Sequence, residues 1–133
     1  MRLTTKSEYS ILALIYIARH KKEGLVKINN IVQEYAIPKK YLEHLLMILK
    51  QNRFLKARRG ASGGYKLALP PSKISVAQII RLMDGALAPT ESASTYFFSH
   101  TPLEKEKKVM GVFKEIRNYV SHRLEKLKLA DFI

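Results

Sequence analysis

The 133-residue chain contains no cysteine. This absence excludes disulfides, thiolate nucleophiles and every metal or iron–sulfur site that requires sulfur ligands. The sequence also lacks an apolar run of roughly 18 residues, and its opening MRLTTKSEYS has no apolar segment of the kind found in secretory signals. We therefore expect a cytoplasmic protein without a membrane partner.

Acidic residues are scarce as well. The chain has 24 Lys and Arg against 11 Asp and Glu, which gives a formal net charge of +13 at pH 7. Residues 1–70 hold 14 of the basic and 4 of the acidic side chains, so most of the excess lies in the first half. Such a field favours a polyanionic partner through counterion release, although a merely soluble basic surface would have the same composition. The length and the 47% hydrophobic content suit one domain with a modest core.

Three helices are predicted in the first 52 residues. TKSE (Thr5–Glu8) matches a capping box that starts a buried helix over 5–20. INNIVQEY (28–35) predicts a short second helix, and Pro38 suits the first turn of a third helix over 38–52. The outward face of this third helix carries Lys39, Lys40, Glu43, His44, Met47 and Lys50.

A glycine-rich hairpin is predicted next. RRGASGGYKLALPP (Arg58–Pro71) contains three glycines that allow a sharp turn. The flanking segments 54–58 and 65–69 alternate apolar with polar or small residues, as half-buried strands do. Two short helices joined by a tight turn and followed by a basic hairpin predict a winged helix-turn-helix, in which the hairpin is the wing.

The second half of the sequence predicts one short and one long helix. A serine cap and an apolar face indicate a helix over 75–85, and a Ser-, Thr- and Pro-rich loop follows over 86–102. From about Leu103 to Lys128 an apolar stripe recurs every three or four residues, at Val109, Phe113, Ile116, Val120 and Leu124. Because a small N-terminal module cannot cover so long a helix, we expect part of the stripe to pack against a second copy of the chain.

The expected fold is therefore mainly α with a small β-hairpin wing. It divides into a winged helix-turn-helix DNA-binding domain (1–85), a sensor or partner loop (86–102), and a dimerisation helix with a C-terminal tail (103–133).

Contact with double-stranded DNA is expected at the start of the third helix and at the wing. The alternative for these charges is an ordinary solvated surface, and for Glu43 and His44 the two interpretations are evenly balanced. The predicted DNA-binding residues are Arg2, Lys27, Pro38, Lys39, Lys40, Tyr41, Glu43, His44, Arg58, Arg59 and Gly63.

No enzyme or metal site is predicted. The four histidines show no ligand spacing, and the sequence has neither a phosphate-binding loop nor a nucleophile elbow. Glu8 is explained by its predicted role in the cap. In the 86–102 loop, Tyr96, Phe97, Phe98 and His100 either anchor the loop to the core or form a surface for a partner protein or small-molecule effector.

Five strings in this order resemble the Rrf2 (BadM-type) family of bacterial winged-helix transcription regulators: MRLTTKSEY, IPKKYLEHLL, RRGASGGYKLALPP, ISVAQIIRLMDG and LKLADFI. The resemblance implies a homodimer that grips a roughly palindromic operator with two recognition helices and two wings. Many members sense iron–sulfur status through three cysteines in the loop after the fourth helix. Here that loop offers Ser92, Ser94, Ser99 and His100 but no thiolate, so the chain resembles the cluster-free branch and no cofactor is expected.

The leading hypothesis is a sequence-specific, dimeric transcription regulator that acts as a repressor. The alternatives are a non-specific nucleic-acid-binding basic protein and an adaptor that acts mainly by binding another protein.

Overall fold

The computed structural model describes residues 1–133, and its first helix, α1, spans Thr5–Arg19. Thr4 is the N-cap, and its hydroxyl oxygen accepts a hydrogen bond from the backbone N–H of Lys6 at 3.2 Å. The predicted capping box between Thr5 and Glu8 is therefore wrong, because Thr5 already lies inside the helix. The predicted helix and its burial are confirmed, with one face sealed in the core at Ala13, Leu14, Ile17 and Ala18.

The next two helices form the predicted helix-turn-helix. Helix α2 spans Ile28–Tyr35 and helix α3 spans Lys39–Gln51. Ala36 adopts a left-handed conformation (φ 53°) that turns the chain between them. Pro38 is the N-cap of α3 rather than part of its first turn. Four leucines of α3 are fully buried, at 42, 45, 46 and 49, and fix which face of this helix points outward.

The predicted wing is a two-stranded antiparallel hairpin. Strand β1 spans Leu55–Arg58 and β2 spans Gly64–Leu67, shorter than the expected 65–69 at its far end. Val26, in the segment before α2, exchanges two 2.8 Å backbone hydrogen bonds with Tyr65. This contact, which local sequence patterns do not show, fastens the wing to the helix-turn-helix.

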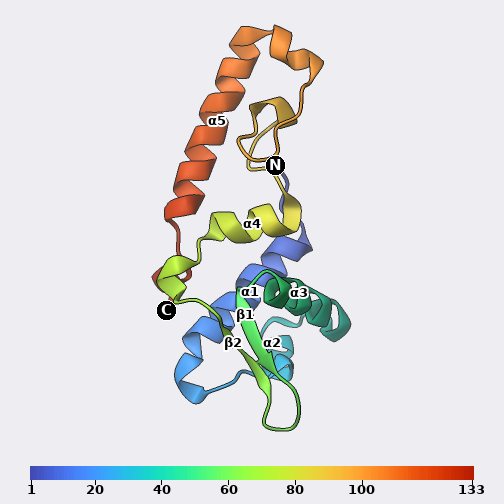
Figure 1. The fold of residues 1–133 in the computed structure, drawn as a ribbon, viewed down its shortest axis with the longest axis vertical. Helices are drawn as coiled ribbons and strands as arrows, with labels where there is room; N and C mark the ends of the chain where they lie inside the picture. The colour runs from blue at the N-terminus through green and yellow to red at the C-terminus, as the bar shows by residue number, and fades with distance from the viewer.

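Helices α1, α2 and α3 and the wing form the base of the molecule. Helix α4 (Val76–Asp84) crosses above this base, and helix α5 (Lys107–Lys126) stands upright beside the 86–102 loop (Figure 1). The predicted serine cap of α4 is confirmed as a capping box between Ser75 and Gln78. Helix α5 starts later than expected, because residues Pro102–Lys105 form a separate 3₁₀ turn. No helix in the structure combines the length and the apolarity that crossing a membrane would require.

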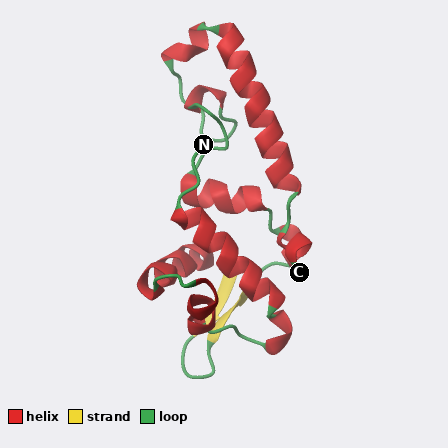
Figure 2. Ribbon diagram, turned by 180° about the vertical axis from the view of Figure 1, so that it is seen from behind, coloured by secondary structure: helices red, strands yellow, loops and turns green.

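The C-terminal tail returns to the base, as Figure 2 shows from behind. Residues Leu129–Phe132 form a 3₁₀ turn, and Leu129 is fully buried in the main core among residues of α1, α3 and α4. Its N–H donates to the carbonyl of Ile74 at 3.0 Å. Helix α1 and the C-terminal tail therefore both belong to the base, whereas the N-terminus lies above α4 (Figure 1), where the Met1 ammonium donates to the carbonyl of Ala88 at 2.8 Å.

Candidate nucleic-acid interface

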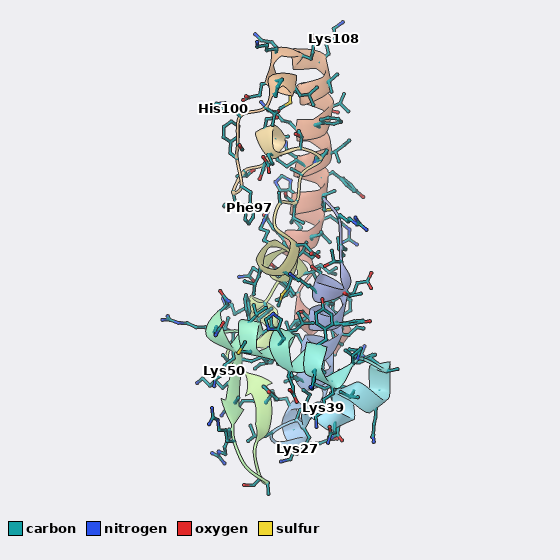
Figure 3. The ribbon with its side chains drawn as sticks, turned by 90° about the vertical axis from the view of Figure 1, so that its right-hand side faces the viewer. Lys27, Lys39, Lys50, Phe97, His100 and Lys108 are labelled. Atoms are coloured by element: carbon teal, nitrogen blue, oxygen red, sulfur yellow. The ribbon has the colours of Figure 1, made fainter.

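The recognition helix α3 presents a polar face because its leucines occupy the opposite side. Lys39, Lys40, Glu43 and His44 are all exposed, as are Met47 and Lys50 one and two turns further along. Figure 3 shows Lys39, Lys50 and Lys27 in the same part of the molecule as the hairpin. The helix face that sequence spacing predicted is thus available to a partner.

The turn of the wing is built on glycines, and Gly63 makes the closest approach. A Cβ atom at Gly63 would lie 2.0 Å from the carbonyl oxygen of Arg58, so no other residue fits there without moving the backbone. Gly60 has φ +98°, and its carbonyl accepts from the N–H of Gly63 at 3.0 Å. Gly63 is buried, so its role is to shape the turn that displays Arg58 and Arg59.

A groove of about 390 Å³ lies between the wing, α3 and the start of α2. Four basic residues line it and no acidic one does: Lys27, Lys50, Arg58 and Arg59. The first turn of α2 also borders it and has no side-chain cap, so the backbone amides of Ile28 and Asn29 are open to an anion. The groove is therefore suited to a phosphate backbone.

Lys27 connects two walls of this groove. Its ammonium group donates a hydrogen bond to the carbonyl of Ala61 at the tip of the wing. Because Lys27 is also the N-cap residue of α2, this contact holds the wing tip toward the helix-turn-helix.

Tyr65 lies on the inner wall of the groove. Burial raises the pKa of its phenol, and the nearby carboxylate of Glu43 raises it further. The phenol therefore stays protonated at neutral pH and keeps a hydrogen-bond donor beside the recognition helix.

Of the predicted DNA-binding residues, the structure brings Lys27, Arg58, Arg59 and Gly63 to this groove, and the others do not line it. Tyr41 turns inward, with its ring edge-on to Tyr9 at 5.8 Å and its hydroxyl 3.2 Å from that of Thr5. Pro38 is exposed and caps α3, whereas Arg2 is exposed but does not line the groove. Tyr41 thus has a packing role that its position in the third helix did not reveal.

Lys50, Asn29 and Tyr65 line the groove but were not among the predicted DNA-binding residues. Lys50 could have been found, because it shares the outward face of α3 with Lys39 and Glu43. Asn29 and Tyr65 could not, because their position depends on how α2 and the wing pack together.

Comparisons with known proteins agree with this geometry. Residues 3–133 match the Rrf2 family, described as iron-dependent transcriptional regulators. A Synechocystis protein named as an HTH-type transcriptional regulator is 32% identical over 131 residues, covering 98% of this chain and 86% of that protein. The chain belongs to the Rrf2 family of transcriptional regulators.

Two relatives named CymR and IscR are similar over much of their length. The HTH-type transcriptional regulator CymR of Bacillus subtilis is 34% identical over 91 residues, covering 68% of this chain and 66% of CymR. The solved structure of CymR, the global cysteine regulator of B. subtilis, has a TM-score of 0.78 at 29% identity and covers 98% of this chain and 95% of that one. The structure of IscR from T. potens has a TM-score of 0.76 at 29% identity, covering 98% of this chain and 85% of that one.

These relationships show that this Rrf2 protein is a winged-helix transcriptional regulator and not an enzyme. Iron dependence in the family description raises the question of a metal site. The donor set does not fit an iron–sulfur group, because the chain has no cysteine and no cluster of three or more His, Asp or Glu side chains that could hold a metal ion.

The 86–102 loop of this Rrf2 protein is packed in part and exposed in part. Ala93 is fully buried against Met110, and its carbonyl accepts from Arg117 Nη1 of α5 at 2.9 Å. By contrast, Tyr96, Phe97 and Phe98 are 68%, 44% and 52% exposed. His100 is exposed and pairs with Glu104 at 3.0 Å. These three aromatic side chains are therefore largely exposed and are not buried in the core.

The predicted stripe on α5 divides between two faces. Phe113, Val120 and Leu124 are half-buried against other parts of their own chain. Val109 and Ile116 are 40% and 44% exposed, and they continue into an exposed apolar face with Val112 and Tyr119, which are 52% and 72% exposed.

Proposed function

We propose that this regulator is a cytoplasmic protein that binds a specific DNA operator as a homodimer and represses transcription. It holds no iron–sulfur cluster. The observation that carries the proposal is the groove between wing and recognition helix, which is lined by four basic residues and no acidic one. Phosphate contacts supply affinity, and base contacts supply specificity.

The two parts of the interface suit different features of a DNA duplex. The exposed face of α3 fits the major groove, where Lys39 or Lys40 can reach guanine or phosphate and Glu43 can accept from a cytosine amino group. The wing, with Arg58 and Arg59 beside its turn, fits the adjacent backbone or minor groove. The first turn of α2 adds amides directed at the same backbone.

The exposed face of α5 supports the homodimer. Val109, Val112, Ile116 and Tyr119 follow one another at helical spacing along a helix of 20 residues. At about 1.5 Å per residue such a helix is about 30 Å long, enough for an extended seam with the same face of a second copy. The dimer would then display two recognition helices for a palindromic operator.

The experiment that tests specificity is competition between operator and random DNA. Genomic fragments selected by the purified protein define the operator, and binding is then measured at fixed salt against an equal mass of random duplex. A specific regulator prefers its operator by a factor of ~10³ or more. Equal competition by random DNA would favour the non-specific alternative and contradict the proposal.

The exposed aromatic residues of the 86–102 loop are the proposed surface for a partner protein or effector. The guanidinium of Arg81 in α4 lies 4.6 Å from the ring centre of Tyr96 and also pairs with Glu125 of α5 at 2.8 Å. A partner that engages Tyr96 would therefore act on both helices. Replacement of Tyr96, Phe97 and Phe98 by alanine should abolish regulation in cells while operator binding by the purified protein is retained. A variant that still regulates transcription normally and still binds the operator would contradict this role.

A further inference from the structure

A second and larger groove, of about 660 Å³, lies between the hairpin and the end of α1 with the turn that follows it. Its apolar lining includes Ile17, Leu25 and Leu69, the last of which is 40% exposed. Four basic side chains also line it, and no acidic residue does: Lys21, Lys56, Arg58 and Lys66. Half of its lining residues are hydrophobic, against a third in the groove between the wing and α3, so an apolar ligand group has more to contact here.

Two of these lysines are placed directly against one another. Lys56 and Lys66 are cross-strand partners in the β1–β2 ladder, so their side chains leave the same face of the hairpin. Neither side chain forms a hydrogen bond or an ion pair with the rest of the protein, and the same holds for Lys21. Like charges directly opposite destabilise a hairpin, so folding alone does not account for this pair.

We propose that this groove binds a small organic anion, a carboxylate or phosphate carried on an apolar body. The volume lies within the ~300–1,000 Å³ typical of small-molecule sites. The anionic group would relieve the repulsion between Lys56 and Lys66, and the apolar body would cover Leu25 and Leu69. A bare inorganic anion would leave the apolar lining in water and gain only the charge contacts.

The geometry also predicts coupling to DNA. Arg58 lines both this groove and the groove between wing and recognition helix. An anion bound at the back of the wing lowers the positive potential that Arg58 presents to a phosphate backbone. Anion binding and operator binding therefore oppose each other, and by linkage each weakens the other by the same factor. This coupling rests on the proposed function, whereas binding of the anion does not.

The binding test uses the 133-residue chain and 8-anilinonaphthalene-1-sulfonate, a fluorescent anion on an apolar body. Lys56→Ala and Lys66→Ala should each weaken probe binding by about tenfold or more, while Lys22→Ala, a change at an exposed lysine of the same region that does not line the groove, should leave it unchanged. Decanoate should displace the probe, and inorganic phosphate at equal ionic strength should not. Displacement by phosphate alone, or equal probe binding by all variants, would overturn the proposal.

Two further readouts separate this site from its alternatives. Without ligand, Lys56→Ala should unfold at the same temperature as the parent or higher, because it relieves repulsion, and decanoate should raise the melting temperature of the parent only. Decanoate should lower operator affinity of the parent by a factor of roughly 5 or more and leave that of Lys56→Ala unchanged. If Lys56→Ala instead lowers the salt dependence of operator binding, the lysine contacts DNA and the proposal is wrong. A parent that binds the probe but has no operator preference would contradict the proposed function and still support the anion site.

Discussion

The hydroxyl of Ser7 in the first turns of α1 donates a 2.6 Å hydrogen bond to Oδ2 of Asp84, the last residue of α4. The same carboxylate accepts from the N–H and the hydroxyl of Thr4, at 2.8 and 2.6 Å. Burial raises the pKa of Asp84, but these hydrogen bonds and the charge of Lys6 lower it by more, so its pKa lies below the ordinary value. One carboxylate thus joins the end of α4 to the start of α1.

Asp84→Asn should therefore destabilise the protein by about 1–2 kcal/mol, the order expected for hydrogen bonds to a charged group that is only half-buried. Because the folded-state pKa is depressed, the contribution is present above the unfolded pKa of about 4 and disappears as the pH falls through the folded value. Denaturant unfolding of parent and variant between pH 7 and pH 3 measures this, with Glu115→Gln at an exposed carboxylate as control. A constant difference across that range would contradict the charged-state assignment.

The basic groove and the exposed face of α3 predict additive losses of DNA affinity. Lys39→Ala, Lys50→Ala and Arg59→Ala should each weaken operator binding without changing the melting temperature. Where the side chain neutralises a phosphate, its removal should reduce the slope of log affinity against log salt by about one unit. Lys105→Ala, an exposed lysine beyond the 86–102 loop, is the control. Parent-like binding by all three variants would show that wing and recognition helix are misplaced.

Gly63 provides a test of the wing that changes no charge. Gly63→Ala should lower operator affinity by about tenfold or more, because the new Cβ would lie 2.0 Å from the Arg58 carbonyl and the turn must rearrange. Gly111→Ala is the matched control: it lies in α5 with no atom within 4 Å of the added Cβ, and should stabilise the protein by about 0.5–1 kcal/mol. Unchanged DNA binding by Gly63→Ala would remove the wing from the interface.

The exposed face of α5 predicts the oligomeric state. Ile116→Glu should give a folded monomer in sedimentation, since it places an unpaired charge in the proposed seam. Val120→Glu should instead lower the melting temperature, because Val120 packs against residues of its own chain. Asn118→Glu, on the other side of the helix, should remain dimeric. A fully dimeric Ile116→Glu protein would show that this face is not the seam.

The absence of thiolate ligands predicts that iron does not change DNA binding. Anaerobic treatment with iron and sulfide should leave the protein colourless and its operator affinity unchanged, because serine and scattered histidines do not replace thiolates at neutral pH. Stoichiometric iron with a visible charge-transfer band would contradict the assignment of this protein as cluster-free.

The helix-turn-helix and the wing followed from the sequence because their signals are local. The leucine spacing of 42–49 defines the buried face of α3 and therefore its exposed face. The glycines at 60, 63 and 64 mark the hairpin turn, where the structure shows positive φ or a close approach that excludes any side chain. In each case the determining residues lie within one or two turns of each other.

Tertiary structure alone decided which groups share a site. Leu129 packs into a core built mostly by residues far from it in the sequence. Helix α5 is apolar both on the face that packs inward and on the face left exposed, so the spacing of its apolar residues could not show which face is buried. The hairpin register alone makes Lys56 and Lys66 cross-strand partners, but Lys27 meets the wing tip because the pairing of Val26 with Tyr65 sets the position of the hairpin. The sequence by itself determined the elements and their exposed faces, whereas long-range packing determined the two basic grooves, because the side chains lining each groove come from segments separated in the sequence.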